Sequence, residues 1–203
     1  SNTLVNSTTS LGSATYTITP SANGCLGQAI TAVANVNPVA TMAALTNISA
    51  CPGATLTPSV FASIPAGSTF TWTNTTISIG LAANGSNNIL PWAAQVNNSV
   101  NNLIGTINVT PTYNGCVGTP GSFTATIFPT PQITTPGLVQ TLCENTASTA
   151  VTFTSNLPNT AMTWTQGATG ANLSGMALGS GNNPLPVMTI SNTASVQQSV
   201  IYQ

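Results

Sequence analysis

Four cysteines and one carboxylate are the residues of this chain that could take part in chemistry. Cys25 and Cys116 both follow an Asn-Gly pair and lie 91 residues apart (116 − 25), while Cys51 and Cys143 lie 92 residues apart (143 − 51). Thiols at repeated positions are candidates for disulfides, whose connectivity cannot be deduced from sequence alone. Disulfides persist in oxidising compartments, so these cysteines favour a secreted, extracellular or cell-surface setting.

The other residue types that carry chemistry are missing. The 203 residues include no Lys, Arg or His, and Glu144 is the only acid. General acid–base catalysis needs a titratable group near working pH, and a hydroxyl nucleophile needs a base. Nucleic-acid binding needs cations, and calcium sites need several carboxylates. We therefore expect no enzyme, no cofactor, no metal and no nucleic-acid partner. Because no apolar run approaches about eighteen residues, we also expect no membrane insertion.

A long internal repeat organises the sequence. The run TFTWT at 69–73 returns as AMTWT at 161–165, which is 92 residues later (161 − 69). The run NNILPW at 87–92 returns as NNPLPV at 182–187, which is 95 residues later (182 − 87). Solenoid and propeller repeats are only about 20–50 residues long, whereas a β-sandwich takes about 100. The period therefore predicts tandem sandwiches.

Within one period the pattern is that of short strands. Apolar and β-branched residues alternate with polar ones, clusters of Pro, Gly and Asn separate the runs, and no helical period is sustained. The predicted strands lie in the runs 55–63, 69–75, 89–96, 104–112 and 121–128. We therefore predict an all-β chain of tandem immunoglobulin-like β-sandwiches.

The repeat also divides the chain. Residues 1–37 are expected to form the C-terminal part of one sandwich repeat, 38–130 a complete repeat, and 131–203 a repeat that lacks its last hairpin. Because the pattern starts and stops inside strands, we expect these residues to be a segment of a longer protein.

The tryptophans lie at informative positions. Trp72 and Trp164 are 92 residues apart (164 − 72), each within Thr-Trp-Thr, which places Trp and Thr on opposite faces of a strand. A sugar-stacking platform is one interpretation, but we favour a core Trp between two sheets, as in immunoglobulin-like domains. Trp92 is replaced by Val187 in the next repeat, so it is the better candidate for a surface contact, with packing as the alternative.

The chain carries the motifs CPGATLTPSVFAS, TFTWTNT, SIGLAANG, NNILPW and GTINVTPTYNGCVGTPGSFTATIFPTP. In these motifs it resembles the PKD-like, immunoglobulin-type tandem repeats of giant secreted proteins of gliding bacteria. Those proteins are cell-surface adhesins and filaments exported by the type IX secretion system. The third repeat departs from the pattern, since TWTQGATGANLSG stands in place of TWTN…IGLA and CEN lacks the glycine of CPG. Its loops are therefore expected to differ.

The Asn-Gly pair predicts where each cysteine lies. Asn-Gly favours a positive-φ turn, which places Cys116, and likewise Cys25, at the tip of the last hairpin of a repeat. Cys51 and Cys143 fall in the turn between the first two strands, at the opposite end of an immunoglobulin-like sandwich. An eight-residue strand spans about 26 Å, whereas bridged Cα atoms lie roughly 4.4–6.8 Å apart. A Cys51–Cys116 bridge within one repeat is therefore not expected to close.

End-to-end stacking of repeats offers the cysteines other partners. Cys51 would meet the cysteine expected near position 211 (116 + 95), and Cys116 would meet one in the preceding repeat. Such bridges would staple successive repeats. Two alternatives stay open: a bridge within a repeat, if the strand order differs, and free buried thiols.

The leading functional hypothesis is a structural segment, a stalk or fibre, of a secreted filament or adhesin that serves cell attachment, gliding or prey contact. The alternative is a glycan- or cell-binding module within an adhesin, acting through exposed loops and Trp92. No predicted strand carries a charge that would block its edge from pairing with another chain, and a net charge of −1 gives little repulsion. We therefore expect identical chains to pack into a multi-stranded fibre, with cell-surface glycans as a further candidate partner.

Overall fold

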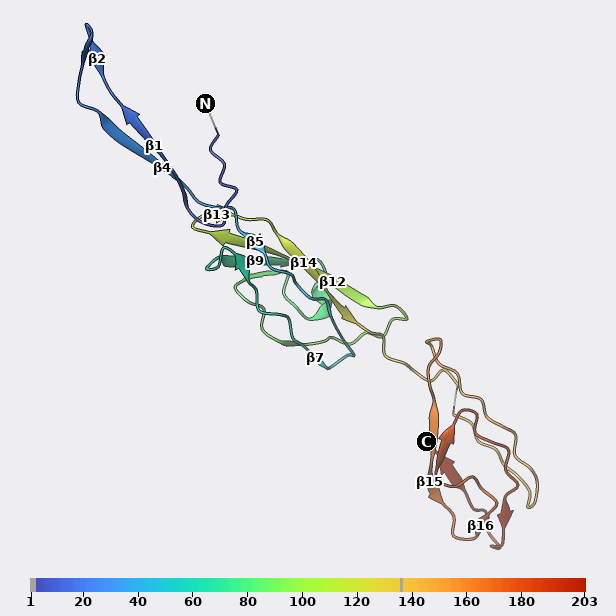
Figure 1. The fold of residues 1–203 in the computed structure, drawn as a ribbon. Coiled ribbons are helices and arrows are strands. Elements are labelled where there is room, and N and C mark those ends of the chain that lie inside the picture. The colour runs from blue at the N-terminus through green and yellow to red at the C-terminus, as the bar shows by residue number, and fades with distance from the viewer. Residues whose placement is uncertain (1–2, 136) are drawn as a thin grey trace. The chain divides into compact units, whose positions relative to one another are not determined.

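The computed structural model describes residues 3–135 and 137–203. The chain forms two compact units, Ser1–Thr130 and Pro131–Gln203, whose strands are traced in Figure 1. Among the described residues the only helical element is the 3₁₀ turn η1 (Ile77–Ile79). The predicted all-β, immunoglobulin-like fold class is confirmed. The further division of the first unit at residue 37 stays a prediction.

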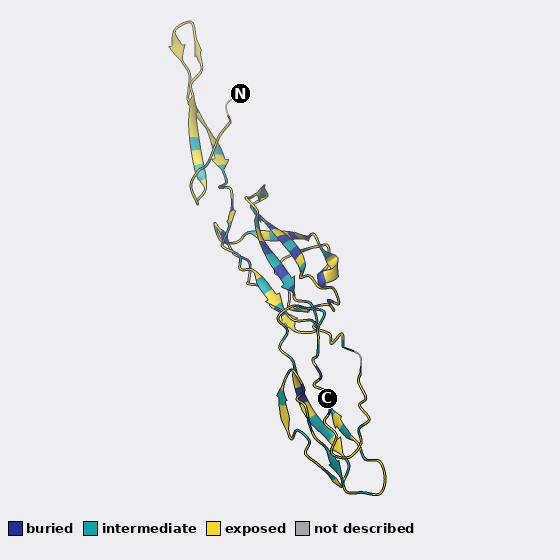
Figure 2. Ribbon diagram, turned by 90° about the vertical axis from the view of Figure 1, so that its right-hand side faces the viewer, coloured by how far each residue is buried: buried dark blue, intermediate teal, exposed yellow. Residues whose placement is uncertain are grey.

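The first unit begins with a long β-hairpin. Its strands are β1 (Gly12–Ile18), β2 (Ser21–Ala22), β3 (Cys25–Leu26) and β4 (Ile30–Val36). β1 pairs antiparallel with β4, and β2 pairs with β3 next to the tip. Most of this hairpin is exposed, as the yellow colouring in Figure 2 shows.

Residues 38–130 form a β-sandwich. One layer is a sheet in the order β10-β9-β12-β14-β6, which is antiparallel except for the parallel pair β14–β6, and β13 folds back on the end of β12. A second layer contains the pairs β5–β8 and β7–β11. The strands of the larger sheet are β6 (Ile48–Ala50), β9 (Thr69–Asn74), β10 (Asn84–Ser86), β12 (Leu103–Tyr113), β13 (Cys116–Val117) and β14 (Gly121–Ile127). Those of the second layer are β5 (Thr41–Met42), β7 (Thr55–Leu56), β8 (Ser63–Ile64) and β11 (Trp92–Ala93).

Two of the predicted strands are much shorter than expected. The run 55–63 contains strand residues only at its two ends, in β7 and β8, and the run 89–96 contains only β11. Pro58 and Pro91 lie inside these runs and have no N–H to donate to a β-ladder. The chain between the strands is irregular, yet it still buries Phe61 and Ile89.

The sandwich encloses one core of twelve buried apolar residues. The strands β12 and β14 supply five of them by alternation, which are Ile107, Val109, Phe123, Ala125 and Ile127. Burying a large apolar side chain stabilises a fold by about 1.5–3 kcal/mol. The last two long strands are therefore central to this core, and buried residues alternate along both of them, as the dark blue in Figure 2 shows.

The second unit has fewer and shorter strands. They are β15 (Thr163–Thr169), β16 (Leu173–Ser174), β17 (Ser180–Asn182), β18 (Ser191–Asn192) and β19 (Val200–Tyr202). β15 pairs with β17 and β19, and β16 pairs with β18. Among the described residues of this unit, four are buried in its core, namely Val151, Trp164, Leu185 and Met188.

The strand registers show which elements of the two units correspond. In the first unit Asn74 of β9 lies opposite Ile107 of β12, and in the second Gln166 of β15 lies opposite Tyr202 of β19. These positions are 92 (166 − 74) and 95 (202 − 107) residues apart, as in the sequence repeat. β19 is therefore the start of a second β12. Among the described residues of the second unit, no strand corresponds to β14.

Candidate functional site

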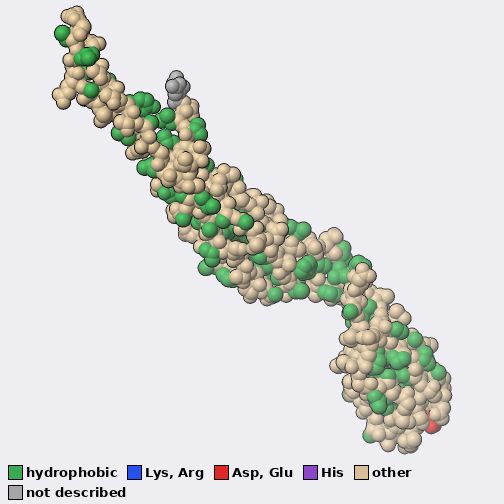
Figure 3. Space-filling model, viewed as in Figure 1, with side chains coloured by type: hydrophobic (Ala, Val, Ile, Leu, Met, Phe, Trp, Pro, Cys, Tyr) green, Lys and Arg blue, Asp and Glu red, His purple; other side chains and the backbone are tan. Residues whose placement is uncertain are grey.

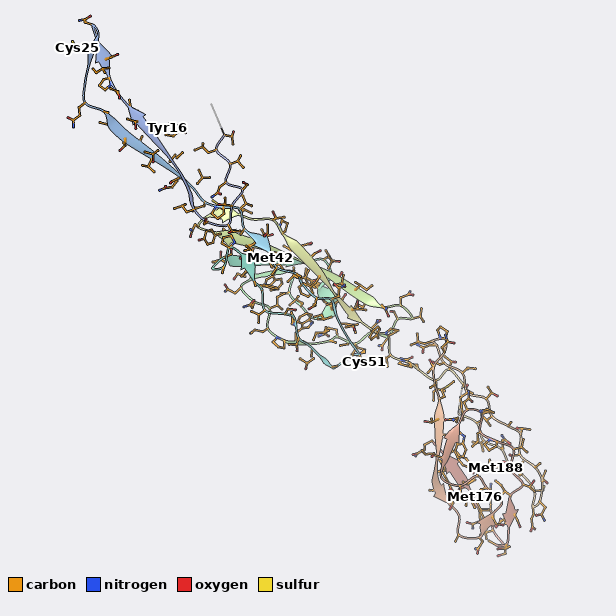
Figure 4. All side chains as sticks on the ribbon, in the orientation of Figure 1. Tyr16, Cys25, Met42, Cys51, Met176 and Met188 are labelled. Atoms are coloured by element: carbon orange, nitrogen blue, oxygen red, sulfur yellow. The ribbon has the colours of Figure 1, made fainter. Side chains whose placement is uncertain are left out.

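The repeated Asn-Gly-Cys phrase forms the tip of a hairpin, as predicted. Asn114 and Gly115 have φ values of 46° and 80°, and they connect Tyr113 to Cys116, which lie opposite each other. Two successive residues with positive φ define the type I′ turn that Asn-Gly favours. Asn23 and its following glycine, with φ values of 47° and 81°, form the same turn before Cys25. Figure 4 shows Cys25 at the tip of the β1–β4 hairpin.

The other repeated residues of the phrase also have local roles. The backbone N–H of Gly118 donates to the carbonyl of Pro111 (2.8 Å), and that of Gly27 donates to Pro20 (2.9 Å). In both hairpins an added Cβ on this glycine would come within 2.9 Å of the proline Cγ. Proline, Asn-Gly and the final glycine thus close the hairpin. The cysteine has no comparable local role, since Cys25 is exposed and Cys116 is half-buried.

The other two cysteines each begin a tight turn. The N–H of Ala54 donates to the carbonyl of Cys51, and that of Thr146 donates to the carbonyl of Cys143, both at 3.1 Å. The third residue of each turn has positive φ, which is 79° at Gly53 and 57° at Asn145. Asparagine tolerates this region better than most residues, so CEN forms the same turn as CPG. Both cysteines are exposed.

The two kinds of cysteine lie at opposite ends of the sandwich. Near the tip, the Asn37 side chain donates to the carbonyl of Asn114 (3.5 Å), and the N–H of Thr119 donates to Ala40 (2.7 Å), where the chain enters the sandwich. At the other end, the N–H of Phe128 donates to the carbonyl of Ala50 (3.0 Å), next to Cys51 and to the exit of the chain.

The strand β14 runs between these two ends. Its seven residues span roughly 20 Å, so the Cα atoms of Cys51 and Cys116 are too far apart for a bridge within the sandwich. All four cysteines of the chain lie among the described residues, and all four are free. The predicted inter-repeat disulfides stay a prediction.

Trp72 and Trp164 occupy equivalent places in the two cores. Trp72 lies opposite Gly85 of β10, and Trp164 lies opposite Gly181 of β17. A Cβ added to either glycine would overlap the indole ring. Each tryptophan ring therefore lies against a glycine of the neighbouring strand. The two glycines are 96 residues apart in the sequence (181 − 85). The sequence reasoning missed these glycines, although their repeated spacing was a usable signal.

Trp92 is half-buried and packs against the core of the sandwich. Its indole N–H donates to the backbone carbonyl of Ile79 at 3.0 Å. The only polar atom of the ring is thus used within the unit, and the surface contact at Trp92 stays a prediction.

A repeated asparagine that the sequence reasoning also missed holds the start of the last hairpin. Asn97 is 4% exposed, and its Nδ2 donates to the carbonyls of Asn101 (2.8 Å) and Ile127 (3.0 Å). Asn6, 91 residues earlier (97 − 6), donates in the same way to Ser10 and Val36. These two asparagines thus tie the loop before one strand of the hairpin to the end of the other.

The counterpart in the second unit is Asn192, 95 residues after Asn97 (192 − 97). Its Nδ2 donates to Val196 (2.9 Å), which corresponds to the bond to Asn101, and its Oδ1 accepts from the N–H of Ala194. Among the described residues of this unit, no backbone carbonyl corresponds to that of Ile127, the second acceptor of Asn97.

A cavity of about 1000 Å³ opens in the second unit. Its lining includes residues 140–142 and β19, with Phe153, Trp164 and Leu185 among the apolar residues. Tyr202 of β19 packs edge-on against Trp164, with ring centroids 5.5 Å apart, and its hydroxyl donates to the carbonyl of Ala177 (3.0 Å). Burial raises the pKa of Tyr202 above its usual value, although this hydrogen bond acts in the opposite direction.

The described residues contain no group of three or more His, Cys, Asp or Glu side chains that could hold a metal ion. Glu144 is exposed, and its carboxylate accepts a hydrogen bond from the Ser191 hydroxyl (3.3 Å). In the part of the chain that the structure describes, no helix is long and apolar enough to cross a membrane.

Fold and sequence together define an immunoglobulin-like sandwich repeat. The PKD-like domain family matches residues 1–40, which contain the β1–β4 hairpin. This match supports a PKD-like, immunoglobulin-like domain in the chain. No curated protein matched the chain in the sequence comparison.

Proposed function

We propose that this chain is a structural segment of a secreted cell-surface filament or adhesin, which forms part of a stalk or fibre. The observation that carries the proposal is the placement of the chain's entry and exit at opposite ends of the sandwich, beside Ala40 and beside Phe128. A module of this kind extends an array with each added repeat. The PKD-like match supports an extracellular, adhesin-type module, and the resemblance to type IX-secreted proteins of gliding bacteria suggests attachment, gliding or prey contact as its setting.

The nearly uncharged surface supports identical chains as the partner. The chain has one carboxylate and no cation, and in Figure 3 the visible face is tan and green apart from one small acidic area. Edge strands such as β10 and β6 therefore lack the lysines and inward charges that usually block pairing with another chain. We propose lateral packing of identical chains into a multi-stranded fibre, through strand edges and hydroxyl- and amide-rich faces.

The proposal gives the cysteines a mechanical role and gives no residue a catalytic one. A thiol at each end of a sandwich could bridge successive repeats and stiffen the array without metal or charge. A catalytic role is not proposed because the sequence contains no His or Lys to activate a nucleophile, and Glu144 is its only carboxylate side chain.

The mass per length of the native assembly tests the proposal. We expect scanning transmission electron microscopy of unstained filaments to give several chains per cross-section. A value corresponding to one chain, with no lateral contacts, would refute the multi-stranded fibre. Reproducible, saturable binding of the 203-residue chain on a glycan array would instead favour the binding-module alternative.

A further inference from the structure

Asparagine followed by glycine occurs at three places in this chain, namely Asn23-Gly24, Asn84-Gly85 and Asn114-Gly115. The pair has a chemistry of its own, because the backbone nitrogen of the glycine can attack the side-chain amide carbon of the asparagine. Glycine has no Cβ to hinder the approach. The three pairs share this sequence but differ in their surroundings, and the structure shows which of them is free to react.

Asn114 and Gly115 lie in open surroundings at the tip of the hairpin formed by β12 and β13. Both residues are exposed, and a Cβ added to Gly115 would meet nothing within 4 Å beyond its chain neighbours. Among the described residues, the N–H of Gly115 makes no backbone hydrogen bond. The carbonyl of Asn114 accepts a hydrogen bond from the Asn37 side chain, which is long at 3.5 Å. Few contacts therefore oppose rotation of this peptide unit.

Asn23 and Gly24 have the same surroundings at the tip next to Cys25, which Figure 4 labels. Their φ values of 47° and 81° match the 46° and 80° of the other tip. Both residues are exposed, and a Cβ added to Gly24 would also meet nothing within 4 Å. Because the two turns repeat in sequence and in geometry, we expect them to react alike.

The pair Asn84-Gly85 is held in place by the sheet. Both residues belong to β10, where they lie opposite Thr73 and Trp72 of β9. A Cβ added to Gly85 would overlap the indole ring of Trp72, which is only 8% exposed. This peptide unit can rotate only if β10 leaves the sheet and uncovers the ring. Opening of a paired and packed segment costs more free energy than opening of an exposed turn.

We propose that Asn114 and Asn23 are sites of covalent modification by water, whereas the fold protects Asn84. The Gly115 nitrogen forms a bond to Cγ of Asn114, the bond from Cγ to Nδ2 breaks, and the amide leaves as ammonia with the proton of the Gly115 N–H. One water molecule then opens the resulting five-membered imide. Attack of water at Cγ gives aspartate, and attack at the backbone carbonyl carbon gives isoaspartate. No oxidant or metal takes part.

The products change the hairpin tip in two ways. Both add a carboxylate, so that reaction at both tips takes the formal net charge of the chain from −1 to −3 (−1 − 2). Isoaspartate also adds a methylene to the main chain, which no longer fits a two-residue type I′ turn. The pair Tyr113↔Cys116 and the contact of Asn37 with the tip are then lost. The two tips are thus where the chain gains charge as it ages, whether or not it forms the proposed fibre.

Timed incubation of the folded 203-residue chain, in mildly alkaline buffer made with water enriched in heavy oxygen, tests the proposal. Peptide mapping with electron-transfer fragmentation distinguishes aspartate from isoaspartate at each position. We expect Asn114 and Asn23 to react at least about tenfold faster than Asn84, and each new carboxylate to carry one labelled oxygen. In concentrated urea the three pairs should react at similar rates, because the fold no longer protects any of them.

Two variants separate the reaction from its consequence. Gly115→Ala should slow the reaction at Asn114 at least about tenfold, because the added methyl group hinders the attack, while Asn23 in the same chain keeps its rate. Asn114→Asp introduces the charge without the extra methylene, and Asp-Gly also favours the type I′ turn. Hydrogen exchange at Cys116 should therefore stay slow in Asn114→Asp and become fast in the isoaspartyl product.

Two results would overturn the proposal. The first is an unchanged Asn114 in the folded chain under conditions in which the urea-unfolded chain reacts at all three pairs. The second is reaction of Asn84 as fast as that of Asn114 in the folded chain, which would mean that the packed strand opens as readily as the turn. Neither result bears on the mass per length that tests the fibre, so the two proposals stand or fall separately.

Discussion

The complete sandwich and the second unit share a framework but differ in their cores. Both have a tryptophan lying over a glycine. Both also have an asparagine that accepts a hydrogen bond from a phenylalanine N–H, Asn88 from Phe61 at 2.7 Å and Asn183 from Phe153 at 2.8 Å. Yet twelve apolar residues are buried in one core and four in the other. The framework is thus set early in each repeat, whereas the last hairpin closes the core.

The sandwich and the second unit also differ in the loop that follows β9 or β15, and one residue position accounts for this difference. Asn74 ends β9, and its buried side chain donates to the carbonyls of Thr76 and Leu81, which holds the turn η1. Gln166 stands at the equivalent place, with Nε2 against the sulfur of Met176 and Oε1 accepting from the N–H of Gly179. The longer side chain reaches a different loop, and β15 continues to Thr169. The predicted departure of the third repeat is therefore visible in its structure.

The largest expected effect comes from the β12–β14 hairpin, which has no counterpart among the described residues of the second unit. Phe123→Ala should lower the free energy of unfolding of the sandwich by about 3–5 kcal/mol, because it leaves a cavity in a closed core. Hydrogen exchange followed by mass spectrometry should show lost protection in β9, β12 and β14 and no change in β15. Equal loss in β15 would mean that the two units do not unfold independently.

The equivalent asparagines Asn97 and Asn192 allow a direct comparison of the sandwich with the second unit. Asn97→Ala should cost the sandwich about 2–4 kcal/mol, because it removes several hydrogen bonds and leaves the Ile127 carbonyl buried. Asn192→Ala, at a half-buried position without that third partner, should cost about 1 kcal/mol. Urea titrations of the two variants measure the difference. Similar costs would indicate that the last hairpin does not make this position more important.

A smaller loss of stability, caused by Tyr202, should appear in the second unit at alkaline pH. Burial raises the folded-state pKa of Tyr202 above the unfolded value. The stability that it contributes is therefore fully present below the unfolded pKa, near 10, and is lost as the pH rises through the folded pKa. The thermal midpoint of this unit should fall between about pH 9 and 11. Tyr202→Phe should show a shallower fall, and an unchanged slope would assign the effect to other groups.

The smallest effect is expected from salt and should be the same in both units. Ionic screening acts on charges, and the chain has only Glu144. Both thermal midpoints should stay nearly constant from low salt to about 0.5 M sodium chloride. A shift of many degrees in either unit would contradict this expectation.

The features that could be predicted from the sequence are those that depend on the same residue types recurring at a fixed spacing. The period, the all-β class and the Asn-Gly turns depend on local patterns, and the structure bears these out. The roles of Gly85 and Asn97 were missed because both depend on a partner distant in sequence, namely Trp72 across a strand pair and the Ile127 carbonyl at the end of β14. Strand lengths around Pro58 and Pro91 were overestimated because apolar alternation outweighed the missing N–H groups.

The parallel pairing of β6 with β14 has a mechanical consequence. β6 lies near the entry segment in sequence, and β14 leads directly to the exit, with Ala125, Thr126 and Ile127 opposite Ile48, Ser49 and Ala50. Tension applied at residues 38 and 130 pulls the two strands in opposite directions along their length. The hydrogen bonds between them are then sheared together instead of opening one by one. Each sandwich can thus act as a load-bearing clamp that resists stretching until several bonds break at once.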